Sequence, residues 1–292
     1  MSPAAARKKR KDEIKVTIAP FRNFADYKSC EDIQKEVYSS HDIDIVPAHI
    51  LVDMNRCGGI LRGAFSSLGD LIGFGCSFPG VEGKKPVQNA SLLAVRAAYR
   101  NFDIGFKLMT VIRQESLKQK ISLVTASIDP MQPAQAYFAL GKMGAWSNRY
   151  EEDCYGETTR YQDRGMPTDR LHVCWDLASS EVDQRLKSGP PRHGLRRELK
   201  KQVIVNQLKE NAPGIIGSST IKLSCSEKAF LLEVPYNLPE IKARDLGMAM
   251  EWQSKMRQAF RHYFRKGYAA TEFFVTTHEG HLRAFYKFEI KK

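Results

Sequence analysis

The sequence is poor in cysteine, and its cysteines are not arranged in pairs. Six cysteines are spread over 292 residues, and no two of them form a Cys-x-x-Cys motif. This spacing excludes the usual zinc sites and the framework of a disulfide-rich secreted domain. We therefore expect reduced thiols in a cytosolic compartment and no bound metal.

Long apolar runs are also missing. No segment approaches the roughly 18 consecutive apolar residues of a membrane-spanning helix. The first thirty residues lack the apolar stretch of about 7 to 15 residues that is typical of a signal peptide. Hydrophobic residues still make up 42% of the chain, enough to form a buried core. We expect a soluble, cytoplasmic protein that does not enter a membrane.

Several catalytic motifs are absent as well. The chain has no Gly-x-Ser-x-Gly elbow, no Walker loop and no Cys-His arrangement, so nothing indicates a serine hydrolase or a P-loop enzyme. His278 and His281 stand three residues apart, but they flank an expected hairpin turn without a nearby cysteine. A metal site is not expected there.

Positive charge is in excess, with a formal net charge of +12. Five basic residues form the run 7–11, and a second basic stretch extends from Arg192 to Lys201. Such runs are either solvated surface or contacts for polyanions such as CoA phosphates or nucleic acid. In a eukaryotic protein the first run would also be typical of a nuclear-localisation signal.

The hydrophobic pattern predicts a mixed α+β protein with two lobes. The expected segments are a disordered basic tail (1–13), a first domain (14–177), a linker with a basic helix (178–201) and a smaller C-terminal α/β lobe (202–292). In the first domain we expect helices at 24–38, after Pro47, at 103–119 and at 133–142. The expected strands are 15–19, 60–65, 71–78, 87–95, 121–128, 146–155 and 171–177, with a loop at 79–86.

The C-terminal lobe shows its own alternation of strands and a helix. Strands are expected at 202–207, 218–224 and 229–235. A long helix follows, which begins with the capping box of Asn237 and Glu240 and closes at Gly267. A hairpin of 268–277 and 282–290 ends the chain. Its aromatic residues Phe273, Phe274 and Phe285 would either stack nucleic-acid bases or pack the lobe.

The most informative segment is Ser91 to Met109, because it indicates a strand, a sharp turn and a helix. The apolar run ends at Val95, and apolar residues then recur at helical spacing from Ile104. The first turn of a helix presents unpaired N–H groups and a dipole that favours an anion. The sequence therefore predicts a phosphate-binding turn between residues 96 and 106.

This turn resembles a family signature. Tyr99-Arg100-x-x-Asp103-x-Gly105 is similar to the Arg/Gln-x-x-Gly-x-Gly/Ala motif of the GNAT superfamily, acyl-CoA-dependent N-acyltransferases whose turn holds the CoA pyrophosphate. One of the two glycines is Asp103 here. Further blocks resemble a branch of predicted GNAT acetyltransferases: Asp129-Pro130, Met143-Gly144-Ala145, Arg149-Tyr150, Tyr155-Gly156, Thr168-Asp169-Arg170-Leu171, Trp175-Asp176-Leu177 and, near the C-terminus, Trp252, Arg257 and Phe260.

The resemblance implies a GNAT fold, with a central mixed twisted sheet flanked by helices, and a CoA ester as cosubstrate. The strand 93–95 would pair with the pantetheine amides, the turn would hold the pyrophosphate, and one helix residue would meet the pantetheine. The implied CoA-binding residues are Leu93, Ala94, Val95, Arg100, Asn101, Phe102, Asp103, Ile104, Gly105, Phe106 and Gln135.

The departures from the family pattern fall at chemical positions. Many GNAT enzymes protonate the departing thiolate with a tyrosine, and its expected position is Leu140 here. Tyr137, one turn earlier, is the substitute, or else it packs in the core. Asp129, after a strand, is the candidate general base, although Asp-Pro also opens turns. Asn89 and Ser91 stand where relatives carry histidines, and the acidic run 151–153 either attracts a cationic amine or is solvated.

The sequence predicts an acyl-CoA-dependent N-acyltransferase that uses acetyl-CoA or another acyl-CoA and acts on an unidentified small or peptidyl amine. Two alternatives stay open. One is a GNAT-fold protein that binds CoA or another phosphate ligand without turnover. The other is a nucleic-acid-associated protein that works through its basic stretches. The acceptor, the acyl chain and the oligomeric state leave no signal in the sequence.

Overall fold

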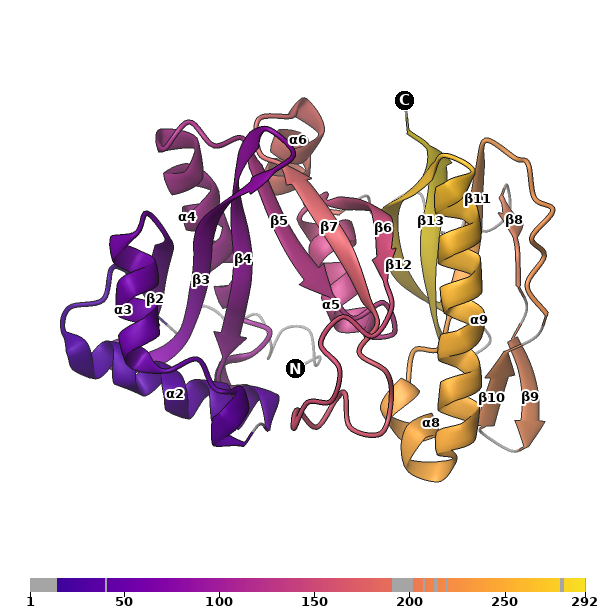
Figure 1. The fold of residues 1–292 in the computed structure, drawn as a ribbon, viewed down its shortest axis with the longest axis horizontal. Helices are drawn as coiled ribbons and strands as arrows, with labels where there is room; N and C mark the ends of the chain where they lie inside the picture. Colours follow the sequence, from indigo (N-terminus) through magenta and orange to yellow (C-terminus); the bar gives the residue numbers. More distant parts are fainter. Residues whose placement is uncertain are drawn as a thin grey trace, which may run out of the picture. The chain divides into compact units, whose positions relative to one another are not determined.

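The computed structural model describes residues 15–39, 41–190, 202–206, 208–212, 215–218, 220–278 and 281–291. These residues form two compact units, one made from 1–125 and 158–164 and the other from 126–157 and 165–292. The expected basic tail (1–13) and the second basic stretch (192–201), within the expected linker and basic helix at 178–201, lie outside the described residues. Both units combine sheet and helix, so the predicted mixed α/β class is confirmed (Figure 1).

The first unit contains a sheet in which the strands follow their sequence order. The strands are β1 (Thr17–Ala19), β2 (Ile60–Phe65), β3 (Leu71–Glu82), β4 (Lys85–Val95) and the start of β5 (Leu123–Ile128). The pairs from β1 to β4 are antiparallel, whereas β4 and β5 run parallel. A parallel pair needs a crossover connection, and the helix α4 (Ile104–Lys118) provides it.

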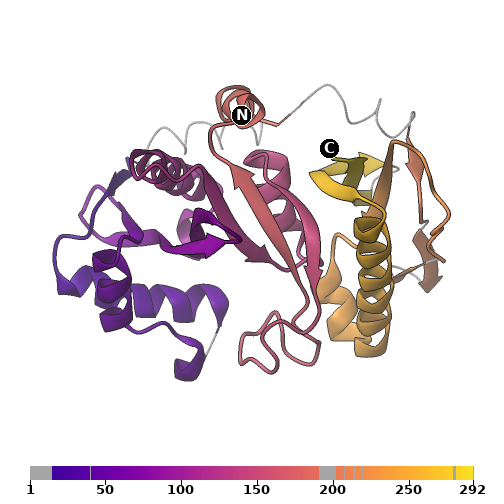
Figure 2. The ribbon, with the colours of Figure 1, turned by 45° about the horizontal axis from the view of Figure 1, so that its top comes forward.

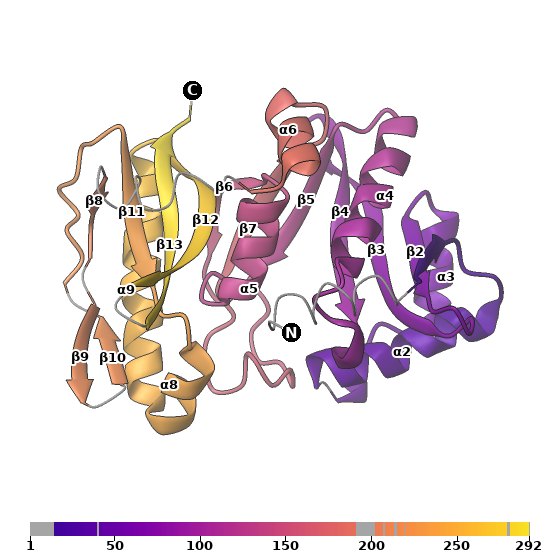
Figure 3. The ribbon, with the colours of Figure 1, turned by 180° about the vertical axis from the view of Figure 1, so that it is seen from behind.

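Helices cover both faces of this sheet. The other helices of the unit are α2 (Phe24–Tyr38), α3 (Ala48–Arg56) and the short 3₁₀ turns η1 (Asp42–Asp44) and η2 (Ala97–Tyr99). Helices α2 and α3 lie on one face and α4 on the other, as the views from the front and from behind show (Figure 1, Figure 3). Two separate hydrophobic clusters result, one around Ile33, Leu51 and Phe74 and one around Ile72 and Leu108.

The helix predictions at 24–38 and 103–119 are confirmed, but the predicted loop at 79–86 is wrong. Strands β3 and β4 continue through it as a hairpin whose register reaches Glu82 opposite Lys85. Gly83 makes the tight turn with a φ of +62°. Pro79 is tolerated because, among the described residues, the pairing of β2 with β3 ends at Ser77. Pro86 is tolerated because the described pairing of β4 with β5 begins only at Gln88.

The second unit is built on a sheet with the order β7-β6-β12-β13-β11-β8. These strands are β6 (Trp146–Glu151), β7 (Arg170–Asp176), β8 (Val203–Ile204), β11 (Ala229–Val234), β12 (Tyr268–His278) and β13 (His281–Ile290). Strands β9 (Leu208–Ala212) and β10 (Ile215–Ser218) pair separately. The C-terminal hairpin therefore extends the sheet of β6 and β7, with Ala270 opposite Ser147. The domain boundaries at 177 and 202 stay a prediction.

The helices of this unit differ in detail from those expected. They are α5 (Pro133–Ala136), a π-helical turn η3 (Tyr137–Lys142), α6 (Ser180–Ser188), α8 (Leu238–Arg244) and α9 (Leu246–Arg265). Helix α9 packs against β12 and β13 (Figure 1, Figure 2), and Phe260 contacts the rings of Tyr286 and Phe288. Phe273, Phe274 and Phe285 are at most 5% exposed, so these rings pack the unit and are not available for base stacking.

Three predictions for the C-terminal segment are wrong in part. The long helix is broken at Asp245, whose carboxylate accepts a hydrogen bond from the N–H of Met248 and starts α9. Asn237 bonds the Glu240 side chain at 2.9 Å instead of capping the backbone. Residues 220–224 are not a strand, although Ile221 and Leu223 alternate. The Lys222 backbone there donates to Val205 C=O and accepts from the Tyr263 hydroxyl, without the ladder of a strand.

Candidate functional site

One edge of β4 is open where the sequence predicts ligand binding. The pairing of β4 with β5 consists of Gln88 with Val124 and Asn89 with Thr125. On its other side, β4 pairs with β3 as far as Val95. Beyond Asn89, no described strand covers the edge of β4 that faces away from β3. An open strand edge offers N–H and C=O groups to an extended ligand.

The register shows which groups point to this edge. Arg96 N–H bonds Ile72 C=O on β3, and antiparallel pairing alternates from residue to residue. Ala94 therefore bonds to β3, and its side chain is buried in the core. Leu93 and Val95 direct their backbone groups to the open edge. These are two of the three strand residues that the sequence assigns to the pantetheine.

Both carbonyls on this edge already accept hydrogen bonds from nearby side chains. The hydroxyl of Tyr38, at the end of α2, donates to Leu93 C=O at 3.2 Å. The Nε of Arg100 donates to Val95 C=O at 3.3 Å. Arg100, one of the implied CoA-binding residues, thus lies beside this edge of β4, and its side chain is exposed. Tyr38 was not predicted.

The turn after β4 is anchored to α2 by Glu36. One carboxylate oxygen accepts from Ala97 N–H at 2.9 Å and the other pairs with the guanidinium of Arg96. The Ala97 N–H first and then the Arg96 cation hold the pKa of Glu36 below its usual range, against desolvation. Glu36 is therefore ionised at neutral pH and fixes the first residues of the turn. Sequence reasoning missed this contact because it joins segments 60 residues apart.

Two residues of the turn have the left-handed backbone conformation. Asn101 has a φ of +70° and Asp103 a φ of +60°. Non-glycine residues adopt this region at a cost, although Asn and Asp tolerate it best. Asp103 thus has the backbone shape that the glycine of the family signature would supply. It occupies the N-cap position of α4, but its side chain makes no capping hydrogen bond.

The remaining residues of the turn differ in how deeply their side chains are buried. Ile104 is 2% exposed and Phe102 packs on the same cluster, so their side chains belong to the core. Gly105 and Phe106 follow in the first turn of α4, whose axis begins at Ile104. Gly105 has no side chain, so its backbone is open to a ligand at the start of the helix. That is the geometry expected for an anion held by helical N–H groups.

The segment after β5 positions Asp129 and Gln135 against each other. Asp129 N–H donates to the Gln135 side-chain oxygen at 3.1 Å, and the Asp129 carboxylate accepts from Met131 N–H at 2.8 Å. Asp129 is 8% exposed. These are the contacts of a side chain that shapes a turn. Gln135 has its amide oxygen engaged in the same turn.

The order and pairing of the elements decide the fold. The described chain runs β-α-α-β-β-β-α-β-α-β-β up to Asp176, with a parallel β4–β5 pair, an α4 crossover and an antiparallel β6–β7 pair. That is the order expected from the resemblance. The described order and pairing of the elements therefore match those expected for a GNAT fold.

Among the comparisons with known proteins, only the comparison with solved structures gives matches. No protein-family model matches the chain, and no curated protein matches it. A putative acetyltransferase of the GNAT family from Desulfovibrio desulfuricans is similar at 16% identity and a TM-score of 0.46, over 56% of this chain and 100% of that one. Arabidopsis thaliana NAA60 in complex with a bisubstrate analogue is similar at 13% identity and a TM-score of 0.46, over 55% and 98%.

A third neighbour is much longer than the matched region. It is the GCN5-related glucosamine N-acetyltransferase region of a fungal multi-domain β-N-acetylglucosaminidase, similar at 19% identity and a TM-score of 0.37. The match covers 43% of this chain and 16% of the fungal chain.

The position that the family resemblance assigns to the general acid is enclosed. Leu140 is 0% exposed, whereas Tyr137 is 38% exposed. Both belong to the π-helical turn η3, which is wider than an α-helix. Gly141, the residue after Leu140, lies against β12, where a Cβ atom would approach Phe273 C=O to 2.4 Å. Tyr137 keeps the exposure that a proton donor to a ligand needs.

Asn89, one of the residues that replace histidine, has a structural contact. Its side-chain amide donates to Thr125 Oγ1 at 3.2 Å, across the last pair of β4 and β5. Ser91 lies at the bulge where the β3 register shifts. Asn89 therefore stabilises the point at which the two strands part.

The acidic run 151–153 is neutralised by the chain itself. Glu151 pairs with Arg149, Glu152 pairs with Arg257 and Arg261, and Asp153 accepts from Thr168 N–H at 3.0 Å. These carboxylates are therefore engaged within the second unit. The interpretation of the run as an attractor for a cationic amine is not supported, because its charge is already compensated.

A buried network joins three of the blocks that carry the family resemblance. Asp169, 0% exposed, accepts from Arg257 at 2.9 and 2.8 Å, from the Tyr150 hydroxyl at 2.5 Å and from Asp153 N–H at 3.0 Å. Burial first, and then the Asp169 charge, raise the pKa of Tyr150 far above its usual value. Tyr150 therefore stays protonated and donates. The network ties α9 to the loop between β6 and β7.

A cavity of about 460 Å³ opens on α9 beside this network. Arg257, Arg261 and Arg265 line it together with Leu223, Ser254, Gln258 and His262. Two of its three arginines already pair with acidic residues of the second unit. The cavity therefore gives little support to polyanion binding at this surface.

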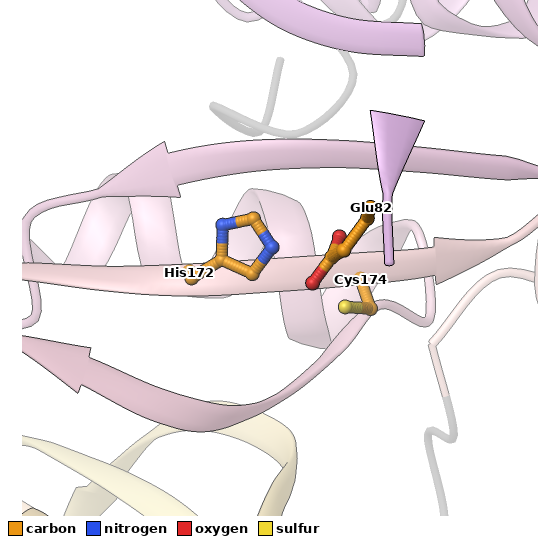
Figure 4. Close-up of side chains that lie close together, drawn as sticks. All are labelled: Glu82, His172 and Cys174. Carbon is orange, nitrogen blue, oxygen red and sulfur yellow. The ribbon is translucent and has the colours of Figure 1, made fainter. Parts of the chain in front are cut away.

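Two side chains that can bind metal ions lie on β7. His172 and Cys174 are two residues apart on β7, so they project from the same face of the strand (Figure 4). No helix in the described part of the chain is long and apolar enough to span a membrane.

Proposed function

We propose that this protein binds an acyl-CoA along the open edge of β4 and transfers the acyl group to an amine. The observation that carries the proposal is the continuity of the edge with the turn. The free edge starts after Asn89, runs past Leu93 and Val95, and leads into a left-handed turn at the start of α4. An extended amide-bearing arm that ends in a pyrophosphate matches this path.

The chemistry is a simple acyl transfer. The amine nitrogen attacks the thioester carbonyl, the N–C bond forms and the C–S bond breaks. Overall, one proton leaves the amine and one reaches the thiolate sulfur. Tyr137 is the proposed proton donor because its ring is 38% exposed. Asp129 is a weaker candidate for the base, since its carboxylate already accepts from Met131 N–H. The acetyl group is the proposed acyl chain.

Calorimetric titration with acetyl-CoA and with free CoA tests the binding site. Gly105→Trp places an indole in the first turn of α4 and is expected to abolish binding. Lys118→Trp adds the same side chain at the exposed far end of the same helix and is expected to bind like the wild type. Equal binding by both variants, or none by the wild type, would exclude this site.

A second candidate function is CoA binding without turnover. Two observations favour it: Leu140 is fully buried at the expected acid position, and the Asp129 carboxylate is engaged in a turn. Thiol release measured over a panel of amines separates the two functions. Binding of acetyl-CoA without release of CoA to any amine would favour the non-catalytic protein.

A further inference from the structure

The hydroxyl of Tyr38 donates a hydrogen bond to a backbone carbonyl that the proposed ligand would also use. We propose that Tyr38 competes with the first amide of the pantetheine arm for the C=O of Leu93, and so sets the affinity for that arm alone. This inference rests on the proposed function. It adds a specificity residue from α2 to a site otherwise built from β4 and the turn.

The contact is specific in its geometry. Tyr38 is the last residue of α2, and the helix ends at Ser39 with a φ of 48°. The hydroxyl reaches Leu93 C=O at 3.2 Å, across 55 residues of sequence. Leu93 is one of the two residues whose backbone groups point to the open edge. Burial raises the pKa of Tyr38, so the group stays a neutral donor.

A second segment of the first unit restrains Tyr38. The guanidinium of Arg160 lies 5.5 Å from the centre of the Tyr38 ring. The neighbouring Thr159 donates to the Asp44 carboxylate through its N–H and its hydroxyl, both at 2.5 Å, and accepts from His41 N–H at 3.0 Å. The Arg160 contact therefore restrains the Tyr38 ring, and Asp44 and His41 hold the segment that carries Arg160.

The competition follows from how an extended ligand adds to a strand edge. Such a ligand gains affinity from main-chain hydrogen bonds to the edge. A carbonyl that already accepts from a protein donor offers a ligand amide only its second lone pair, so the amide gains less there than at a carbonyl without a partner. The nucleotide end of CoA makes no use of Leu93. Tyr38 should therefore weaken the binding of the pantetheine arm and leave the nucleotide unaffected.

The variant Tyr38→Phe removes the hydroxyl and keeps the ring. Tyr27→Phe is the matched control, because it lies on the same helix and its hydroxyl also takes part in a 3.2 Å hydrogen bond, accepted from Asn55 Nδ2. Each variant loses one hydrogen bond, so their melting temperatures should fall by similar amounts. Melting curves of both confirm that the proteins are folded.

The test is calorimetric titration of the full chain and both variants with acetyl-CoA and with adenosine 3′,5′-bisphosphate, which lacks the pantetheine arm. Tyr38→Phe is expected to bind acetyl-CoA roughly fivefold more tightly, the worth of one neutral hydrogen bond, and the bisphosphate as the wild type does. Tyr27→Phe should change neither. Unchanged or weaker binding of acetyl-CoA by Tyr38→Phe, or an equal gain for both ligands, overturns the competition. If the wild type binds neither ligand, the proposed function fails with it.

Discussion

The guanidinium of Arg257 holds the carboxylate of Asp169 through two hydrogen bonds, of 2.9 and 2.8 Å. Asp169 is completely buried, whereas the Arg257 side chain is 28% exposed. A paired charge in the interior is tolerated, but an unpaired one is very costly. This pair connects the C-terminal helix α9 to the start of β7, and the stability of the second unit should depend on it.

Arg257→Ala is therefore expected to destabilise the protein by about 3 kcal/mol, because it leaves a buried carboxylate without its cation. Arg261→Ala, one turn along α9, removes a contact with the partly exposed Glu152 and should cost less than about 1 kcal/mol. Urea denaturation of both variants measures the difference. Equal losses would show that the Asp169 pair has no special role.

Asp103→Gly should strengthen CoA binding. The substitution removes a carboxylate from the turn and supplies the residue that the φ of +60° favours. We expect acetyl-CoA to bind about three- to tenfold more tightly, because a like charge near the pyrophosphate is lost. Lys120→Gly is the control, since Lys120 has a φ of +62° at the other end of α4. It should change stability as Asp103→Gly does but leave affinity unchanged. An equal change in affinity for both would contradict the prediction.

Tyr137→Phe should lower kcat and leave KM unchanged if the hydroxyl protonates the leaving thiolate. General acids contribute about 100-fold or more to the rate. Tyr155→Phe, which alters another half-exposed tyrosine of the second unit, is the control and should keep full activity. Steady-state assays of thiol release, with the amine found by the panel, measure both. Full activity of Tyr137→Phe would remove it from the mechanism.

Asp26 should make the free energy of unfolding of the first unit depend on pH in the acidic range. Its carboxylate accepts from Arg22 N–H, Nε and Nη2, and the Arg22 hydrogen bond holds its pKa below the ordinary value of 3.8. A lowered pKa in the folded state gives stability that is present above pH 3.8 and is lost as the pH falls through the folded-state pKa. The stability gap between the wild type and Asp26→Asn should be constant from pH 7 to 5 and shrink below pH 4. Urea denaturation across this range checks it, and a gap that grows in acid would contradict it.

Local patterns were enough to predict much of the fold. The helix from Phe24 to Tyr38 is specified by the Asn23 cap and the apolar spacing, and α4 by the periodicity that begins at Ile104. The hairpin arm at 79–86 was missed, since Gly, Lys and Pro are typical of loops. The break at Asp245 was missed because one aspartate in a helical pattern carries little signal until its carboxylate is seen to cap Met248.

The candidate site was predicted as a location and incompletely as a set of contacts. Leu93, Val95 and Arg100 lie at the open edge, as expected. Tyr38 and Glu36 could not be predicted, because they reach β4 and the turn from α2 across 55 and 61 residues. The only signal in the sequence is that these two polar side chains stand near the end of an amphipathic helix. That position does not indicate which segment they contact.

The sequence by itself determined where strand gives way to helix around Arg100, because the switch of apolar period and the shape of the turn are local properties. It also determined that a carboxylate, Asp103, stands where a glycine is expected. Only the tertiary structure decided which groups meet at that place. The strand β4 parts from β5 after Asn89, Tyr38 covers Leu93, and Arg257 neutralises Asp169. Each of these depends on packing between distant segments, and pairing at that range leaves no periodic trace in the chain.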